Sequence, residues 1–242
     1  MRGGIRWLAS ASALACAQVA AAAIPSAANS SLPRVVVLVG HADAHADTTS
    51  GAFTVVVRDV ADDPMPFERV EVRPLDCPGA RVAVDQLQPG VSPRCATNAV
   101  QADTDLDGIV RIAIVGGGDA AAPHGSGPFA TVLGGPVALG VVRVAYLDLD
   151  GSGGLGANDL SIWLADFGTG EPIARADYDG DNTVGASDLS LWLTAFGGGG
   201  SVHSASSACS DFPRGHRLRA RREGPYPRGR GRRAEAGPGG GA

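Results

Sequence analysis

The sequence contains no lysine, so all 20 of its basic residues are arginine, and aromatic residues make up only 5% of it. The patterns G-x-S-x-G, H-E-x-x-H and C-x-x-C are also absent. Because these patterns mark common esterase, metalloprotease and thiol-redox sites, their absence argues against an enzyme of those classes. After the N-terminal region no apolar run is long enough to span a membrane, which argues against stable membrane insertion. We therefore expect a non-catalytic protein.

Residues 1–28 have the order of a secretory signal peptide. Two arginines come first, an alanine-rich apolar run follows, and small residues end the segment. That order predicts cleavage after Ala23 or Ala28 and a secreted, extracellular protein. Two weaker interpretations stay open. One is a membrane anchor, and the other is a lipoprotein, since Cys16 follows a leucine that lies one place out of the lipoprotein register.

Between residues 35 and 146 apolar and polar residues alternate over many short stretches separated by turns. A period of two predicts β-strands. The predicted strands are residues 35–39, 52–58, 67–73, 99–102, 109–115, 129–133 and 137–145. Many short strands without a long helical period predict a mainly β fold, and specifically a β-sandwich. The segments 55–64 and 104–112 resemble bacterial Ig-like domains of the invasin type, which implies binding or spacing and not catalysis.

Two polar clusters lie among these strands. The first comprises His41, Asp43, His45 and Asp47. On one strand all four would share a face, which would suit a transition metal, although solvated side chains are the commoner explanation. The second comprises Asp103, Asp105, Asp107 and Gly108. It begins like a calcium loop, but its twelfth position holds Ile114, so the sequence predicts an Asp-Gly hairpin turn instead.

One pattern occurs twice between residues 145 and 197. In each copy, oxygen-bearing side chains fall at positions one, three, five and twelve of a twelve-residue loop. The ligands predicted for loop one are Asp148, Asp150, Ser152 and Asp159, with the carbonyl oxygen of Gly154 at position seven. Those predicted for loop two are Asp177, Asp179, Asp181 and Asp188, with the carbonyl oxygen of Thr183. Calcium takes six to eight oxygen ligands at this spacing, so we expect two Ca²⁺ ions.

Each loop leads into a short helix. Position six requires a sharp turn with positive φ, which Gly153 accepts freely and Asn182 at modest cost. The expected N-caps are Asn158 and Ser187, and the expected left-handed end residues are Gly168 and Gly197. The apolar residues at helical spacing are Leu160, Trp163, Leu164 and Phe167, then Leu189, Trp192, Leu193 and Phe196. Helices this short do not persist alone, so we expect the two apolar faces to pack on each other.

The two loops differ in charge. Loop two offers four carboxylates and loop one offers three, because Ser152 stands where the second copy has Asp181. Additional carboxylates strengthen calcium binding, so we predict that loop two binds more tightly than loop one. We also predict that calcium contributes to folding of the repeat, because clustered carboxylates repel one another without an ion.

An aspartate closes each loop where the ordinary EF-hand has glutamate, and D-L-S-x-W-L begins at each closing aspartate. In these features residues 146–196 resemble the tandem repeat of type I dockerins. The resemblance implies calcium binding and attachment to a cohesin domain in an extracellular polysaccharide-degrading assembly. Dockerin contacts include a Ser/Thr pair at loop positions ten and eleven. This sequence has Ala157 and Asn158 there, and Ala186 and Ser187 in the second copy.

Two other interpretations of the repeat are possible. Gly151, Gly153 and Gly156 match the G-x-G-x-x-G pattern of dinucleotide-binding turns. The second copy keeps the aspartates and has Asn182 in place of the middle glycine, and no βαβ pattern surrounds either copy. Aspartate-rich turns that bind nothing would not be expected to place the same carboxylates identically twice. Calcium binding is therefore the favoured interpretation.

The four cysteines are Cys16, Cys77, Cys95 and Cys209. Signal cleavage would leave three of them in a secreted chain, where disulfides persist. Cys77 and Cys95 flank one long connection between predicted strands. We therefore predict that these two form a disulfide and that Cys209 is left over.

The predicted organisation is a signal peptide (1–28), a polar lead-in (29–50), an Ig-like β-sandwich (35–146), a dockerin-like α module of two calcium repeats (147–199) and a disordered tail (200–242). From Phe212 onward nine arginines stand against two glutamates, so an acidic body precedes a basic tail. Such a tail can bind anionic polymers, but no nucleic acid is expected as a partner.

We predict a secreted, non-catalytic calcium-binding protein that acts in docking, adhesion or scaffolding, with a cohesin-like or cell-surface protein as its partner. Two alternatives stay open. One is a component of a polysaccharide-degrading assembly that docks a cohesin-like partner. The other is a small secreted hydrolase or hydrolase accessory that uses the surface of the sandwich. His124, in a loop rich in glycine and proline, is the residue whose substitution would test it.

Overall fold

The computed structural model describes residues 23–74, 77, 79–118, 129–169, 174–197 and 209, all within the unit Met1–Phe212. Most of the predicted signal peptide lies outside the described residues. So do His124, Cys16 and nearly all of the predicted tail.

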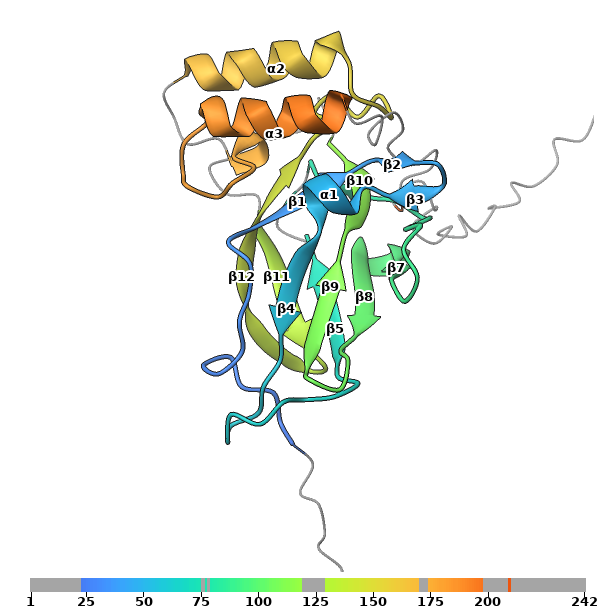
Figure 1. Ribbon diagram of the computed structural model, residues 1–242, viewed down its shortest axis with the longest axis vertical. Helices are drawn as coiled ribbons and strands as arrows, with labels where there is room; N and C mark the ends of the chain where they lie inside the picture. The colour runs from blue at the N-terminus through green and yellow to red at the C-terminus, as the bar shows by residue number, and fades with distance from the viewer. Residues whose placement is uncertain are drawn as a thin grey trace, which may run out of the picture. The chain divides into compact units, whose positions relative to one another are not determined.

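The described chain is mainly β, as the sequence predicts (Figure 1). Its main sheet has eight strands in the order β6-β10-β1-β12-β11-β5-β8-β7. In chain order these are β1 Val35–Val39, β5 Arg69–Arg73, β6 Arg81–Val82, β7 Ser92–Arg94, β8 Ala99–Asp103, β10 Ile114–Gly117, β11 Phe129–Gly134 and β12 Val137–Tyr146. Strand β1 is parallel to both of its neighbours, β10 and β12, and the other neighbouring pairs are antiparallel.

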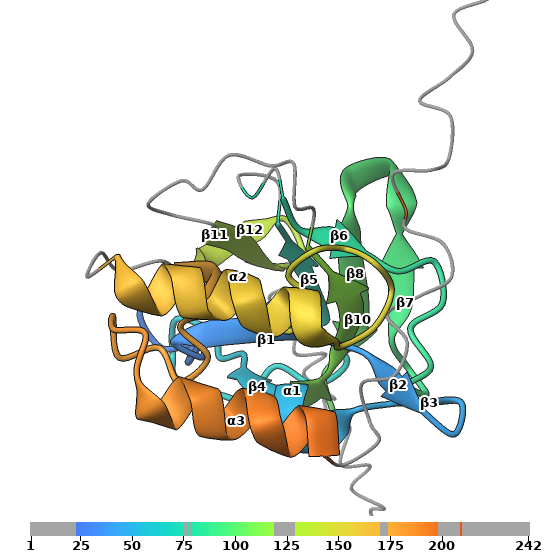
Figure 2. The same cartoon turned by 90° about the horizontal axis from the view of Figure 1, so that it is seen from above.

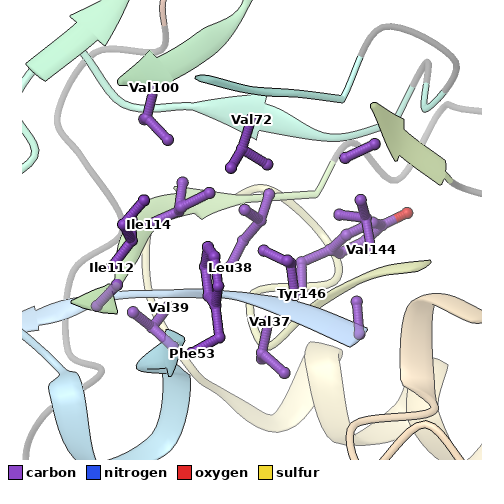
Figure 3. Packing of buried hydrophobic residues seen from close by; sticks show 14 of the residues in the cluster. Val37, Leu38, Val39, Phe53, Val72, Val100, Ile112, Ile114, Val144 and Tyr146 are labelled. Atoms are coloured by element: carbon purple, nitrogen blue, oxygen red, sulfur yellow. The ribbon is translucent and has the colours of Figure 1, made fainter. Parts of the chain in front are cut away.

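A two-stranded antiparallel sheet of β4 (Phe53–Val56) and β9 (Ile109–Ile112) accompanies the main sheet. In both strands every second residue is buried, which is the pattern of a sheet with one face on a core. Phe53 and Ile112 join the same hydrophobic cluster as residues of the main sheet, among them Val72 and Val100 (Figure 3). Side chains from the two sheets thus build one shared core.

The predicted strand 109–115 is two strands in the structure. Strand β9 ends at Ile112, and β10 begins at Ile114 and pairs with β1 and β6, whereas β9 pairs with β4. The chain therefore passes from the small sheet to the main sheet at Ala113, which is buried. The sequence pattern could not reveal this change of partner, because β9 buries every second residue and β10 buries all of its residues, and neither pattern identifies the neighbouring strand.

Asp105 holds the turn between β8 and β9. Its Oδ1 accepts the backbone N–H groups of Asp107 and Ile109 at 2.9 Å each, and Gly108 has a φ of +73°. The predicted tight turn is confirmed. The hairpin is wrong, because β8 pairs with β5 and β7 while β9 pairs with β4.

The alternating His and Asp residues do not lie on one strand. β2 (His41–Ala42) and β3 (His45–Ala46) form a hairpin, and Asp43 and Ala44 make its turn with positive φ angles of 48° and 61°. Asp47 leaves the hairpin and caps helix α1 (Thr48–Gly51) by accepting the N–H groups of Thr49 and Ser50. The less favoured interpretation, in which all four side chains share one strand face, is therefore wrong.

The disulfide prediction is also wrong. Cys95 pairs with Cys209, with a Cα–Cα distance of 4.5 Å across 114 residues of sequence. Cys77 is a free thiol buried beneath a turn in which its carbonyl oxygen accepts the N–H of Ala80. Spacing along the sequence favoured the pair that is closer in sequence. It carries no information about which part of the fold Cys209 contacts.

Two longer helices follow β12: α2 (Ala157–Gly168) and α3 (Ala186–Gly197), and the short 3-10 helix η2 (Ala174–Ala176) lies between them in the chain. A further 3-10 turn, η1 (Cys95–Thr97), precedes β8. Figures 1 and 2 show α2 and α3 beside each other at one end of the main sheet. None of the described helices is both long and apolar enough to cross a membrane.

The predicted helix caps need correction. Both helices begin two residues earlier than expected, α2 at Ala157 with Gly156 as its N-cap and α3 at Ala186, so Asn158 and Ser187 lie inside the helices. Gly168 is the last residue of α2, and the C-cap Thr169 has right-handed backbone angles. Gly168 and Gly197 are therefore helical residues and not left-handed ends.

Candidate metal centre

Loop one follows directly from the last strand of the main sheet, because β12 ends at Tyr146 and Asp148 comes two residues later. One carboxylate oxygen from each of Asp148, Asp150 and Asp159 lies within 4.8 Å of the others. Asp148 and Asp159 are buried, and Asp150 is partly exposed. The structure therefore brings together three of the predicted ligands, those at positions one, three and twelve.

Loop two repeats this arrangement. Oxygen atoms of Asp177, Asp179 and Asp188 also lie within 4.8 Å of one another, again with positions one and twelve buried. The predicted ligands at position five, Ser152 and Asp181, are exposed, and the Asp181 carboxylate is not among the three that converge in loop two. Asp181 Oδ1 instead accepts the N–H and the hydroxyl of Thr183 at 2.7 Å each.

The closing aspartate of each loop is held by the same backbone donors. Asp159 Oδ1 accepts the N–H groups of Leu149 and Asp150 at 2.7 and 3.0 Å, and its Oδ2 accepts Gly156 N–H at 2.7 Å. In loop two, Asp188 accepts the N–H groups at the equivalent positions, those of Tyr178, Asp179 and Gly185, at 2.6, 3.2 and 2.8 Å. Each closing carboxylate thus ties the start of its loop to the first turn of its helix.

The backbone at position six has the predicted conformation in both loops. Gly153 has a φ of +93° and Asn182 a φ of +76°. Their N–H groups are both donated at 3.0 Å to the Oδ2 atom of the first aspartate, Asp148 in loop one and Asp177 in loop two. The carbonyl-bearing residues at position seven, Gly154 and Thr183, follow these turns in the chain, as the loop spacing requires.

Burial raises the pKa of both closing aspartates, although three backbone N–H groups on each partly oppose this effect. The charges of Asp150 and Asp179, at position three of the same loops, also act to raise these pKa values. A buried carboxylate beside another is costly to ionise without a cation. The donor set, oxygen atoms from clustered carboxylates, is the one that Ca²⁺ prefers, so the residues present fit a calcium ion.

Half of the predicted apolar helix positions are exposed. Trp163 and Trp192 are each 2% exposed and belong to the core cluster of the sheets. Leu164 and Leu193, which follow them directly, are 53% and 49% exposed. Because the tryptophans point into the shared core, the next positions turn away from it. The prediction that each whole apolar face packs on the other helix is therefore wrong.

Two arginines beside the loops were missed by the sequence analysis. Arg143 lies in β12, and its Nη1 is 2.9 Å from Asp177 Oδ2. Arg175 in η2 forms a buried ion pair with Asp166 of α2. No helical or strand spacing links either pair, because 34 residues separate Arg143 from Asp177 and 9 separate Asp166 from Arg175. The only signal was that each arginine interrupts an otherwise apolar segment.

Comparisons of the chain with protein-family models, with curated proteins and with solved structures gave no match. The interpretation of the site therefore rests on its residues and their geometry.

Proposed function

We propose that the protein binds two calcium ions, one in each repeat loop. The observation that carries this proposal is that the aspartates at positions one, three and twelve converge in both loops with equivalent backbone hydrogen bonds. Gathering three carboxylates is unfavourable unless a cation compensates their charge. The proposed ligands are Asp148, Asp150, Ser152, Asp159 and the Gly154 carbonyl in loop one, and Asp177, Asp179, Asp181, Asp188 and the Thr183 carbonyl in loop two.

Calorimetric titration of the chelator-treated chain with calcium chloride tests this proposal. We expect two binding events with dissociation constants of about 10⁻⁴ to 10⁻³ M, the range of extracellular sites. Asp159→Asn and Asp188→Asn should each abolish one event, because each removes a closing carboxylate. Asp107→Asn is the matched control, since Asp107 is an exposed aspartate in a turn outside the repeats. Absence of any binding at millimolar calcium in the unsubstituted chain would show that the loops are merely acidic turns.

The β domain is an Ig-like sandwich in this proposal, and residues 147–199 are a dockerin-like module. The sandwich is supported by the common core that the β4–β9 sheet shares with the main sheet. The dockerin-like module is supported by the two loop–helix units, each closed by an aspartate within the first turn of its helix.

The wider role we propose is docking, adhesion or scaffolding. The supporting observation is that α2 and α3 each present a leucine and a phenylalanine to solvent: Leu164 and Phe167 are 53% and 54% exposed, and Leu193 and Phe196 are 49% and 53% exposed. Exposed apolar side chains grouped on short helices suit a protein partner. A cohesin-like or cell-surface protein is the proposed partner, which would place the chain in an extracellular assembly acting on polysaccharides.

Surface plasmon resonance with immobilised cohesin domains tests the docking role. We expect binding in calcium that is lost in chelator and in a Leu164→Asp, Leu193→Asp double variant, while Leu106→Asp serves as the control because Leu106 is 72% exposed in the β domain. Binding that persists in chelator or in the double variant would contradict a calcium-dependent helical docking face.

We also propose that the protein is secreted and that it has no catalytic activity. Among the two expected signal cleavage positions, Ala23 suits the fold better, because Ser26 N–H donates to Arg58 O at 2.8 Å and a cut after Ala28 would remove that contact. Mass spectrometry of the exported protein identifies the cut. Esterase and glycosidase assays test the absence of catalysis, and turnover that disappears in His124→Ala would contradict it.

A further inference from the structure

Arg143 differs from every other donor to the first aspartate of loop two because it comes from outside the loop. It lies in β12, and its guanidinium reaches both Asp177 Oδ2, at 2.9 Å, and Asn182 Oδ1. The Asp177 side chain is only 3% exposed and that of Arg143 is 26% exposed. The ion pair is therefore largely shielded from solvent, where charge-assisted hydrogen bonds are strong.

The two oxygens of Asp177 already have four donors. Oδ1 accepts the N–H groups of Gly180 and Asp181 at 2.8 and 3.1 Å, and Oδ2 accepts the N–H of Asn182 at 3.0 Å together with Arg143. An ionised carboxylate has about four acceptor positions in total. A cation can therefore bind Asp177 only if one of these four donors leaves.

Arg143 is the donor that can leave. The three backbone N–H groups belong to the loop itself, and removing any of them would undo the turn that includes Asn182 at its φ of +76°. The guanidinium is on a flexible side chain and carries the positive charge that a cation would replace. It also borders a groove of about 410 Å³ whose lining includes Arg34, Phe129 and Val141, which offers room for it.

We propose that Arg143 is a built-in competitor of calcium at loop two, and that calcium binding at Asp177 displaces its guanidinium into the neighbouring groove. This inference rests on the proposed calcium function. It makes Arg143 an affinity-setting residue supplied by the β domain, because it neutralises Asp177 in the absence of the ion. The additional carboxylate of loop two strengthens calcium binding, whereas the Arg143 guanidinium weakens it. Because Arg143 lies outside the repeat, the sequence pattern of the repeat does not show this second effect.

The test is a calcium titration of the full chain followed by NMR, because backbone amides report each loop separately. Ser152 and Gly153 report loop one, and Asp181 and Asn182 report loop two. We expect Arg143→Gln to lower the calcium concentration at the loop-two midpoint by about tenfold, since it removes a competing charge-assisted bond. The loop-one midpoint should stay unchanged.

Arg34→Gln is the matched control, because Arg34 lines the same groove and no ion pair is found for it in the described part of the chain. It should leave both midpoints within about twofold, the usual effect of a screened surface charge. Arg143→Met, which keeps the apolar stem, repeats the measurement should the Gln variant fail to fold. In the unsubstituted protein, calcium should also shift the Arg143 Nε–H resonance as the ion pair opens.

The possible failures are distinguishable. If neither loop responds to calcium in any variant, the proposed function is wrong and this inference falls with it. If both loops bind calcium but Arg143→Gln and Arg143→Met leave the loop-two midpoint unchanged, or shift both midpoints equally, Arg143 is not a competitor. If Arg34→Gln shifts loop two as strongly as Arg143→Gln, general charge and not the ion pair sets the affinity.

Discussion

Arg175 and Asp166 form a bidentate ion pair in which Nε lies 2.7 Å from Oδ2 and Nη2 lies 2.6 Å from Oδ1. Both side chains are almost fully buried, at 6% and 4% exposure. Asp166 is in α2 and Arg175 is in η2, directly before loop two. The pair therefore links the helix of the first repeat to the entrance of the second calcium loop, so that the two repeats form one structural unit.

Breaking this pair should be strongly destabilising. Asp166→Leu alone leaves the arginine buried without its carboxylate, and we expect a loss of about 3 to 5 kcal/mol in unfolding free energy. The double variant Asp166→Leu, Arg175→Met should lose much less, because both charges leave the interior together. Urea denaturation of the single and double variants in chelator measures both values. A double variant less stable than Asp166→Leu alone would show that the pair adds stability beyond charge balance.

The two repeats differ in one hydrogen bond made by a buried tryptophan. A matched pair of variants can measure how much this bond contributes to stability. Trp192 Nε1 donates to Leu147 O at 3.3 Å, directly before Asp148, whereas buried Trp163 Nε1 has no partner in the described part of the chain. Each indole stacks on a phenylalanine four residues later, with centroid distances of 5.3 and 5.5 Å. The apolar surroundings are thus similar, and the hydrogen bond is the main difference.

We expect Trp192→Phe to cost about 1 kcal/mol more unfolding free energy than Trp163→Phe. The first substitution breaks a hydrogen bond and leaves a buried carbonyl with one partner fewer, while the second removes an unsatisfied donor. Thermal denaturation in chelator gives the difference directly, and each variant controls for the ring volume lost in the other. Equal losses would mean that the bond to Leu147 contributes nothing to stability.

Most of the β structure was predictable because each strand buries a particular set of its residues. The alternation in β4 and β9 marked both strands, and β12 ends within one residue of its predicted limit. Pairing partners were not predictable from the same pattern. β9 and β10 are separated only by Ala113 in the sequence, yet they belong to different sheets, because the burial pattern of a strand does not identify its neighbouring strand.

The candidate site shows the same division. The loop spacing predicted the convergence of Asp148, Asp150 and Asp159 because the chain between them is short and its turns are fixed by local chemistry. The contact of Arg143 with Asp177 depends on how the sheet meets the second loop, which no local period encodes. The exposure of Leu164 was likewise not predicted, because its helical spacing is that of a buried residue, whereas the structure buries Trp163 and turns Leu164 toward solvent.

Glu71 provides a pH-dependent contribution in the β domain. It is buried in β5, and its carboxylate accepts Arg73 Nε at 2.6 Å and Nη2 at 3.1 Å. The hydrogen bond from Arg73 holds the pKa of Glu71 below its ordinary value, although burial acts in the opposite direction. A lowered folded-state pKa means that the stabilisation is present above the unfolded-state value, about 4.3, and is lost as pH falls through the folded-state value.

We therefore expect Glu71→Gln to lower the unfolding free energy by about 1.5 to 3 kcal/mol at pH 7, the usual range for a hydrogen bond to a charged group. This difference should shrink as the pH falls below about 4.3 and vanish once Glu71 is protonated in both states. Urea denaturation between pH 7 and pH 2 measures it. Asp85→Asn, at an exposed carboxylate in the same domain, serves as the control. A constant difference at all pH values would assign the effect to packing.

The disulfide between Cys95 and Cys209 should make the stability of the protein depend on whether Cys209 is present. It closes a loop across 114 residues, so the chain-entropy estimate of its stabilisation is about 5 kcal/mol. A chain cut after Ala208 loses Cys209, whereas one cut after Ser210 keeps it. We expect the chain cut after Ala208 to have a much lower melting temperature than the chain cut after Ser210. The chain cut after Ser210 should have the melting temperature of the full chain. Calorimetry of all three chains without reductant measures these values.

Cys95→Ser in the chain ending at Ser210 should reproduce the loss seen on cutting after Ala208, and the two changes combined should cost no more than either alone, because both remove the same bond. Cys77→Ala provides the contrast, since Cys77 lies outside the disulfide. Burial raises the pKa of the Cys77 thiol to about 11, so it should also resist alkylation at pH 8 until the protein unfolds. If Cys77 were instead oxidised in the native protein, unfolding without reductant would release no thiol from it, and the pairing of Cys95 with Cys209 would be contradicted.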